Sequence, residues 1–222
     1  MTGLERWPES PAAAREVQEQ LRSKVVREDR FGAIQCVAGL DAHYASERRL
    51  AWAAAAVVTR PRSDLRESAL AYCPLRFPYI PGLLSFREAP AMLAALDALS
   101  TKPDLLLIDG QGLAHPRRFG LACHVGVLAD MPAIGIAKSR LIGAHEKPGV
   151  ERGSWCALFH RGEMLGAVVR TRHSVRPVFV SIGHRVSLDT AIKLVLELAP
   201  RYRLPEPIRL ADRLSRMHTP TR

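Results

Sequence analysis

The spacing of hydrophobic positions changes several times along the chain, and each change predicts a different element. Ser10 and Pro11 predict an N-cap followed by a first helical residue, and apolar residues recur at helical spacing as far as Val25. Residues 36 to about 60 and 65–75 are runs of small, β-branched and apolar residues broken by charged turns. The first part of the chain is therefore predicted to be an amphipathic helix followed by a meander of roughly three strands.

The second part of the chain alternates between helical and strand-like segments. Residues 103–108 form a continuous apolar run, typical of a central strand buried on both faces, which ends at Asp109. Helices are expected at 90–100, 119–130 and 187–199, a short buried strand at 132–137, and two or three strands at 155–180. This order predicts an α/β fold with a mixed β-sheet flanked by helices on both faces.

Residues 77–82, with the sequence Phe-Pro-Tyr-Ile-Pro-Gly, interrupt this regular pattern. Each proline removes a backbone donor and keeps the preceding residue out of helical conformation, so a stiff loop is expected here. The pattern alone is equally compatible with Tyr79 and Ile80 being exposed or folded back into the core.

Composition and charge narrow the class of protein. The chain has 222 residues, 47% of them hydrophobic, which suits one globular domain covering 1–222. Lys and Arg number 32 against 22 Asp and Glu, so a polyanionic partner is favoured, although basic proteins without such partners are common. The four cysteines form no CxxC pair, and no signal peptide or membrane-spanning run is evident. We expect free thiols, no membrane association and a cytoplasmic location.

Two aspartates are candidates for chemistry. Asp41 lies in an otherwise apolar strand, where an ionised side chain is costly without a partner, and Asp109 ends the predicted central strand. If the two strands are neighbours, the carboxylates can share Mg²⁺, which prefers oxygen ligands and can activate water for attack on a phosphodiester. Taken singly, either aspartate is as compatible with a cap or a salt bridge.

Two further acids are less certain from the pattern alone. Residues 85–88 match a capping box that ends in Glu88, but Pro90 would then fall beyond the first turn. The helix is therefore expected to begin near Pro90, which leaves Glu88 free to face a metal. Asp212 is flanked by Arg209 and Arg213, a setting typical of a surface ion pair.

Several blocks of sequence together resemble a known family. They are GLD at 39–41, PYIPGLLSFRE at 78–88, DGQG at 109–112, HPRRFGLA at 115–122, IGIAK at 134–138, GHRVS at 183–187 and RLPEPIR at 203–209. From about Leu21 to Asp212, the chain resembles the endonuclease V (deoxyinosine 3′ endonuclease) family. One small departure is Gln111, where the family often has histidine.

The resemblance implies a ribonuclease H-like fold and a catalytic set. Asp41, Glu88 and Asp109 would hold Mg²⁺, for which Mn²⁺ is expected to substitute, and Lys138 would lie near the scissile phosphate. Asp212 would support a metal or water, at a position where some members carry histidine. The implied reaction cuts the second phosphodiester 3′ to a deaminated purine and leaves 3′-hydroxyl and 5′-phosphate ends.

The resemblance also implies how nucleic acid is held. The wedge that fills the gap left by a flipped base would be Pro78, Tyr79, Ile80 and Pro81. The base pocket would use Gly82, Leu84, Gly110 and Gly112, although glycines in such a pattern alone indicate only turns. His115 is expected to contact phosphate. Arg117 and Arg118 fit contacts to the nucleic-acid backbone by their charge, but two adjacent arginines are more typical of a solvated loop.

The expected partner is therefore DNA with deaminated bases, bound by a monomer. An alternative is an endoribonuclease that acts mainly on inosine-containing RNA. A non-catalytic binding module is disfavoured by the intact acidic set, and a junction resolvase is disfavoured by the wedge.

Overall fold

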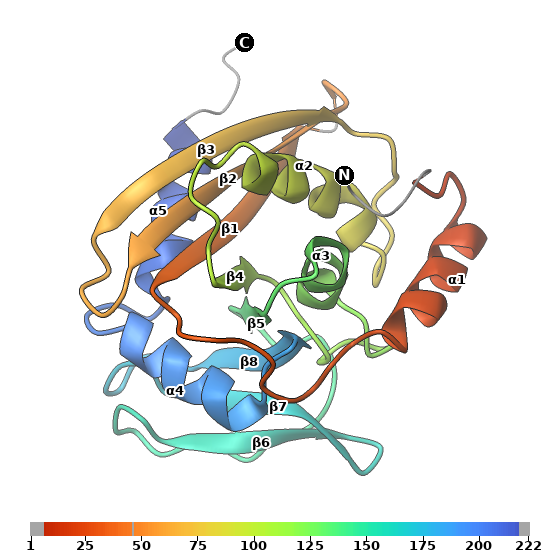
Figure 1. Cartoon of the computed structure of the whole chain (residues 1–222). Coiled ribbons are helices and arrows are strands. Elements are labelled where there is room, and N and C mark those ends of the chain that lie inside the picture. Colours follow the sequence, from red (N-terminus) through yellow and green to blue (C-terminus); the bar gives the residue numbers. More distant parts are fainter. Residues whose placement is uncertain (1–6, 46, 218–222) are drawn as a thin grey trace.

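One mixed sheet organises the molecule. The computed structural model describes residues 7–45 and 47–217, and within them eight strands follow the order β3-β2-β1-β4-β5-β8-β7-β6 (Figure 1). Strands β1, β4 and β5 are parallel to one another, and the other neighbouring pairs are antiparallel. The strands are β1 (Cys36–Ala45), β2 (Leu50–Thr59), β3 (Leu65–Pro74), β4 (Leu105–Asp109), β5 (Ala133–Ala137), β6 (Trp155–His160), β7 (Glu163–Val169) and β8 (Val178–His184).

Helices cover both faces of this sheet, as the sequence predicts (Figure 1). The described helices are α1 (Pro11–Arg22), α2 (Ser85–Asp97), α3 (Leu121–Ala129), α4 (Leu188–Leu198) and α5 (Glu206–Met217). Alternate residues of β2 show the arrangement, because Ala53 and Ala55 pack in the cluster that contains α2, whereas Ala54 and Ala56 pack against Ala211 of α5. None of the described helices is long and apolar enough to cross a membrane.

Most of the predicted elements are present. Ser10 caps α1, with its Oγ accepting from the Ala13 N–H at 3.2 Å, and Ser187 caps α4 by accepting from the Thr190 N–H at 3.3 Å. The meander is β1-β2-β3, and all four cysteines are free thiols. The predicted mixed sheet with helices on both faces is therefore confirmed.

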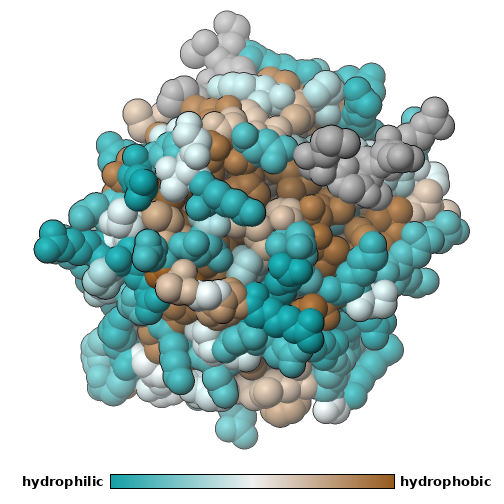
Figure 2. Space-filling view, viewed as in Figure 1, coloured by the Kyte–Doolittle hydropathy of each residue, from teal (hydrophilic) through white to brown (hydrophobic). Residues whose placement is uncertain are grey.

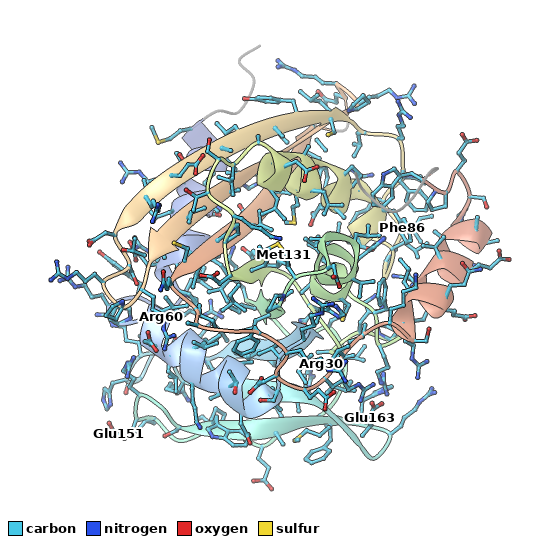
Figure 3. The ribbon with its side chains drawn as sticks, viewed as in Figure 1. Arg30, Arg60, Phe86, Met131, Glu151 and Glu163 are labelled. Carbon is cyan, nitrogen blue, oxygen red and sulfur yellow. The ribbon has the colours of Figure 1, made fainter. Side chains whose placement is uncertain are left out.

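The predicted start of α2 is wrong. This helix begins at Ser85 rather than near Pro90, and its N-cap residue Leu84 makes no side-chain capping bond, so no capping box forms either. Proline inside a helix costs about 3 kcal/mol because it removes a hydrogen bond and crowds the preceding turn. The buried apolar residues of α2 offset that cost, among them Phe86, which Figure 3 shows on the side of the helix facing α1.

The face shown in Figure 2 carries a groove of mixed polar and apolar lining where α2 and α3 end. Its volume is about 310 Å³, and Leu93, Leu96, Leu128 and Met131 contribute to its lining. The amino ends of β4 and β5 lie at this face, because Pro103 and Met131 just before them also line the groove. The predicted catalytic acids lie at the other end of these strands.

Candidate active site

The register of the sheet brings the two predicted aspartates together. Leu40 of β1 pairs with Ile108 of β4 in parallel, so that Asp41 and Asp109 are the next residues of neighbouring strands. The two strands are therefore neighbours in the sheet, which is the condition under which these carboxylates can share a metal ion. Asp41 is only 6% exposed, and the Asp109 side chain is 12% exposed.

Glu88 joins this pair from the first turn of α2. It is buried, and burial first, then the charges of Asp41 and Asp109, raise the pKa of its carboxyl to about 8. The pKa of Asp41 is raised to about 7, mainly by burial and then by Asp109. Acids that repel one another away from water favour a cation, and their oxygens are the ligands that hard divalent ions prefer.

Lys138 follows β5 and donates to the carboxylate of Asp109, while its Nζ lies 3.9 Å from Asp212 Oδ1. Burial alone would lower the pKa of this ammonium, but the neighbouring carboxylates, Asp109 first, raise it overall. Its side chain is 42% exposed. The structure therefore places a charged amine at the solvent side of the acidic cluster.

A close crossing of α5 over β1 brings Asp212 into this cluster. A Cβ on Gly39 would lie 2.1 Å from the backbone carbon of Pro207, so only glycine permits this approach. One turn further on, the Ser215 hydroxyl lies 3.2 Å from Asp41 Oδ2. The sequence did not reveal the role of Gly39, because the crossing joins segments far apart in the chain.

The ion pairs of α5 differ from the sequence prediction. Arg209 pairs with Glu206 at 2.6 Å, and Asp212 pairs with Arg216 at 3.0 Å. Asp212 therefore does form an ion pair, but with Arg216 rather than with the flanking arginines that the sequence indicated. The other oxygen of Asp212, Oδ1, is the one nearer Lys138.

His43 is a site residue that the sequence analysis missed. It lies two residues after Asp41 on β1, hence on the same face of the strand, and its Nε2 is 3.3 Å from Asp41 Oδ2. Burial lowers the pKa of its imidazole. Each of Asp41, His43 and Asp212 offers one ligand atom, and these atoms lie within 4.8 Å of one another. The alternate spacing of Asp41 and His43 was the signal that could have found it.

A cavity of about 160 Å³ adjoins the acidic cluster, because Gly110, which follows Asp109, lines it. The Pro-rich loop and the residues after β4 both contribute to its lining. The lining is mostly apolar and consists of Tyr79, Ile80, Pro81, Gly82, Leu84, Ser85, Gly110, Gln111, His115, Gly120, Leu121 and Leu141.

Two of the predicted substrate-binding residues lie outside this lining. Pro78 precedes it in the loop, and Gly112 packs against β8, where a Cβ would lie 2.0 Å from the carbonyl oxygen of Ile182. The Gly112 N–H donates to Ser181 Oγ at 2.8 Å. Gly112 thus allows the loop after β4 to approach the sheet closely.

The tip of the Pro-rich loop is only partly folded back. Tyr79 is 64% exposed, whereas Ile80 is half-buried against the cluster formed by α1 and α2. The alternative in which both side chains fold back into the core is therefore wrong for Tyr79 and correct in part for Ile80. The buried Arg87 stiffens the loop by donating to the Phe77 carbonyl at 3.0 Å, with its guanidinium 5.9 Å from the centre of the Tyr79 ring.

His115 does not present a cation to a phosphate. It is buried, its Nε2 lies 3.0 Å from the Gly82 carbonyl oxygen, and its Nδ1 accepts from the Arg117 N–H at 3.2 Å. Burial, which is the main cause, lowers the pKa of His115 to about 4, so the ring is neutral at pH 7. His115 therefore fixes the pocket wall at Gly82, and its contact with phosphate stays a prediction.

The two neighbouring arginines are not a solvated pair. Arg118 is buried and donates to Glu163 at 2.6 Å. Arg117 donates to Gln18 and to the Gly82 carbonyl oxygen. Both arginines therefore hold loops together, and the prediction of a solvated loop is wrong.

Known proteins share this sequence and this arrangement. The family model described as Endonuclease V matches residues 19–213. The chain belongs to the endonuclease V family. A relative from Trichormus variabilis, named Endonuclease V, is 52% identical over 94% of this chain and 95% of its own length.

Solved endonuclease V structures share the ribonuclease H-like fold. The one from Streptomyces avermitilis has a TM-score of 0.91 and 46% identity, covering 95% of this chain and 93% of that chain. Endonuclease V of Ciona intestinalis, solved with a DNA containing an inosine followed by a ribo-adenosine, has a TM-score of 0.80 and 31% identity, covering 95% and 98%. The resemblance and the fold inferred from the sequence are thus confirmed.

Proposed function

We propose that this endonuclease V family member is a metal-dependent endodeoxyribonuclease that recognises deoxyinosine and related deaminated purines. It cuts the second phosphodiester 3′ to the lesion and leaves 3′-hydroxyl and 5′-phosphate ends. The observation that carries the proposal is the cavity at Gly110, directly beside Asp109 and its buried neighbours Asp41 and Glu88. A base held there would bring its own strand to the acids.

The acidic cluster fits a divalent cation. Asp41, Asp109 and Glu88 would hold Mg²⁺, or Mn²⁺ in its place, and Asp212 would support a metal or a water. A bound cation supplies activation of water and stabilisation of the leaving oxygen. Lys138, already held by Asp109, neutralises charge on the phosphate because its half-exposed ammonium can reach a ligand at the rim.

The Pro-rich loop would act on the base. Tyr79 projects from a loop that two prolines and Arg87 make rigid, so its ring can replace the stacking lost when a base leaves the duplex. The small residues Gly82 and Gly110 leave room in the cavity for a purine and expose backbone groups to its six-position carbonyl. Pro78 would act by holding the loop.

Inosine-containing RNA is a second candidate substrate. The Ciona intestinalis structure, whose DNA has a ribo-adenosine after the inosine, favours keeping this alternative. Both substrates place the same base in the pocket, and they differ at the 2′-hydroxyl of the sugar next to the cut. We expect one domain acting as a monomer in the cytoplasm, where its four free thiols stay reduced.

The test uses end-labelled duplexes with one deoxyinosine, a matched duplex with deoxyadenosine, an inosine-containing RNA and a branched junction. The expected result is a single nick at the second phosphodiester 3′ to deoxyinosine, with Mg²⁺ and not with chelator. Faster cutting of the RNA would favour the second candidate. Tight binding without a nick, or cutting of the junction alone, would contradict the proposal.

A further inference from the structure

His43 lies among acidic residues, but its ring nitrogen Nε2 makes no hydrogen bond. Its Nε2 is buried and has no hydrogen-bond partner, although Asp41 Oδ2 lies 3.3 Å away. That oxygen is instead within 3.2 Å of the Ser215 hydroxyl, whose geometry is suitable for a hydrogen bond. A buried polar nitrogen that lacks a bond costs free energy unless a ligand completes it.

The surroundings hold this imidazole in place. His43 is paired across the sheet with Trp52, and the two ring centroids are 6.0 Å apart. Trp52 is itself fixed, because its indole N–H donates to the Ser215 carbonyl at 2.9 Å. One residue of β2 thus links the histidine on β1 to the helix that carries Asp212.

The three candidate ligand atoms are spaced for one ion. Donor atoms that bind one small divalent ion at about 2.0–2.2 Å lie at most about 4.4 Å apart. The ligand atoms of Asp41, His43 and Asp212 lie within 4.8 Å of one another, so a shift of a few tenths of an ångström would suffice. Asp212 Oδ2 pairs with Arg216 at 3.0 Å, whereas Oδ1 lies 3.9 Å from Lys138 Nζ.

We propose that His43 supplies a nitrogen ligand to a divalent metal position that it forms with Asp41 and Asp212. The inference rests on the proposed metal-dependent function. It adds a nitrogen ligand to the carboxylate ligands proposed there. Imidazole nitrogen suits transition-metal ions, whereas Mg²⁺ prefers oxygen. His43 therefore makes this position favour Mn²⁺ and similar ions over Mg²⁺, while Asp109 and Glu88 remain available to an oxygen-bound ion.

Electron spin-echo spectroscopy of bound Mn²⁺ tests this inference directly, because a coordinated imidazole gives a ¹⁴N coupling. We expect the coupling in the wild-type protein and its loss in both His43→Gln, which keeps a side chain of similar length, and His43→Ala. Mn²⁺ should bind about tenfold or more weakly to these variants. Mg²⁺ affinity, measured by calorimetry, should change much less.

His173→Ala is the matched control, since His173 is an exposed histidine paired with Glu151. It should keep both the coupling and the affinity. Mn²⁺ bound to the wild-type protein without a ¹⁴N coupling, and with unchanged affinity in His43→Ala, would overturn the role of His43 alone. Absence of Mn²⁺ binding to the wild-type protein would overturn both this inference and the proposed metal-dependent function.

Discussion

The two ends of β4 each carry an aspartate, and the partners of these carboxylates differ. Asp104, just before the strand, accepts backbone N–H bonds from Gln35 at 2.8 Å and from Cys36 at 2.9 Å. Asp109, at the other end, lies in register beside the buried Asp41. The first arrangement satisfies a carboxylate with two backbone donors, and the second crowds acids that repel one another. The difference indicates that the amino end serves stability and the carboxyl end serves ligand binding.

Glu88→Gln should have the largest effect on activity. It keeps the size of a buried side chain and removes the charge that a cation would need, so nicking should fall by about 10²–10³-fold. The unfolding temperature at pH 8 should rise, because the cost of burying the charge, and then its repulsion from Asp41 and Asp109, is lost. Nicking rates measure the expected fall in activity, and thermal unfolding measures the expected rise in stability. Unchanged activity would remove Glu88 from the site.

Gly39→Ala should have the second-largest effect on activity. The added Cβ would overlap the backbone of Pro207, which forces α5 and with it Asp212 away from β1. We expect an activity loss approaching about 10²-fold and a loss of about 1–3 kcal/mol in the free energy of unfolding. Gly32→Ala is the control, because a Cβ there meets nothing within 4 Å. Equal behaviour of the two variants would show that the crossing does not position the site.

Tyr79→Ala should have a smaller effect that is confined to the substrate. Stacking of an aromatic ring on a base contributes about 1–3 kcal/mol, so binding of a deoxyinosine duplex should weaken by roughly 5- to 150-fold. Thermal stability should be unchanged, since the side chain is 64% exposed. Tyr79→Phe should bind as the wild type does. Loss of stability without loss of binding would assign the ring to folding.

The smallest expected effect is a change of stability with pH in chelator. The folded-state pKa values of Asp41 and Glu88 are raised to about 7 and about 8, above their ordinary values. The folded protein therefore holds more protons than the unfolded chain between about pH 4 and pH 8, and this contribution, complete in acid, is lost progressively as pH rises from about 4 through 7 to 8. The unfolding temperature should fall over that range relative to an Asp41→Asn, Glu88→Gln double variant. Added Mg²⁺ should restore the unfolding temperature of the wild-type protein. The same dependence of unfolding temperature on pH in the wild type and the double variant would contradict the prediction.

Patterns local in sequence predicted much of the fold. The apolar run before Asp109, the meander and the Ser187 cap each depend on neighbouring residues, and the structure has them all. The juxtaposition of Asp41 and Asp109 was also predictable, because an acid in an apolar strand is costly without a partner and Asp109 ends the neighbouring strand.

Features that depend on tertiary packing were not predictable in this way. Local preference placed the start of a helix at Pro90, but burial of α2 against the sheet overrode it. Arg118 was expected in solvent, whereas its partner Glu163 lies on a distant strand. The role of Gly39 became visible only when α5 was seen to cross β1.

The most direct test of the central claim compares Asp41→Asn with Asp104→Asn in nicking of a deoxyinosine duplex with Mg²⁺. The account predicts that Asp41→Asn loses the metal-dependent nick while its unfolding temperature at pH 8 rises. Asp104→Asn should cut at the wild-type rate and unfold more readily, because a charged acceptor of two backbone N–H groups is lost. Wild-type cutting by Asp41→Asn would contradict the assignment of the carboxyl end of these strands as the active site.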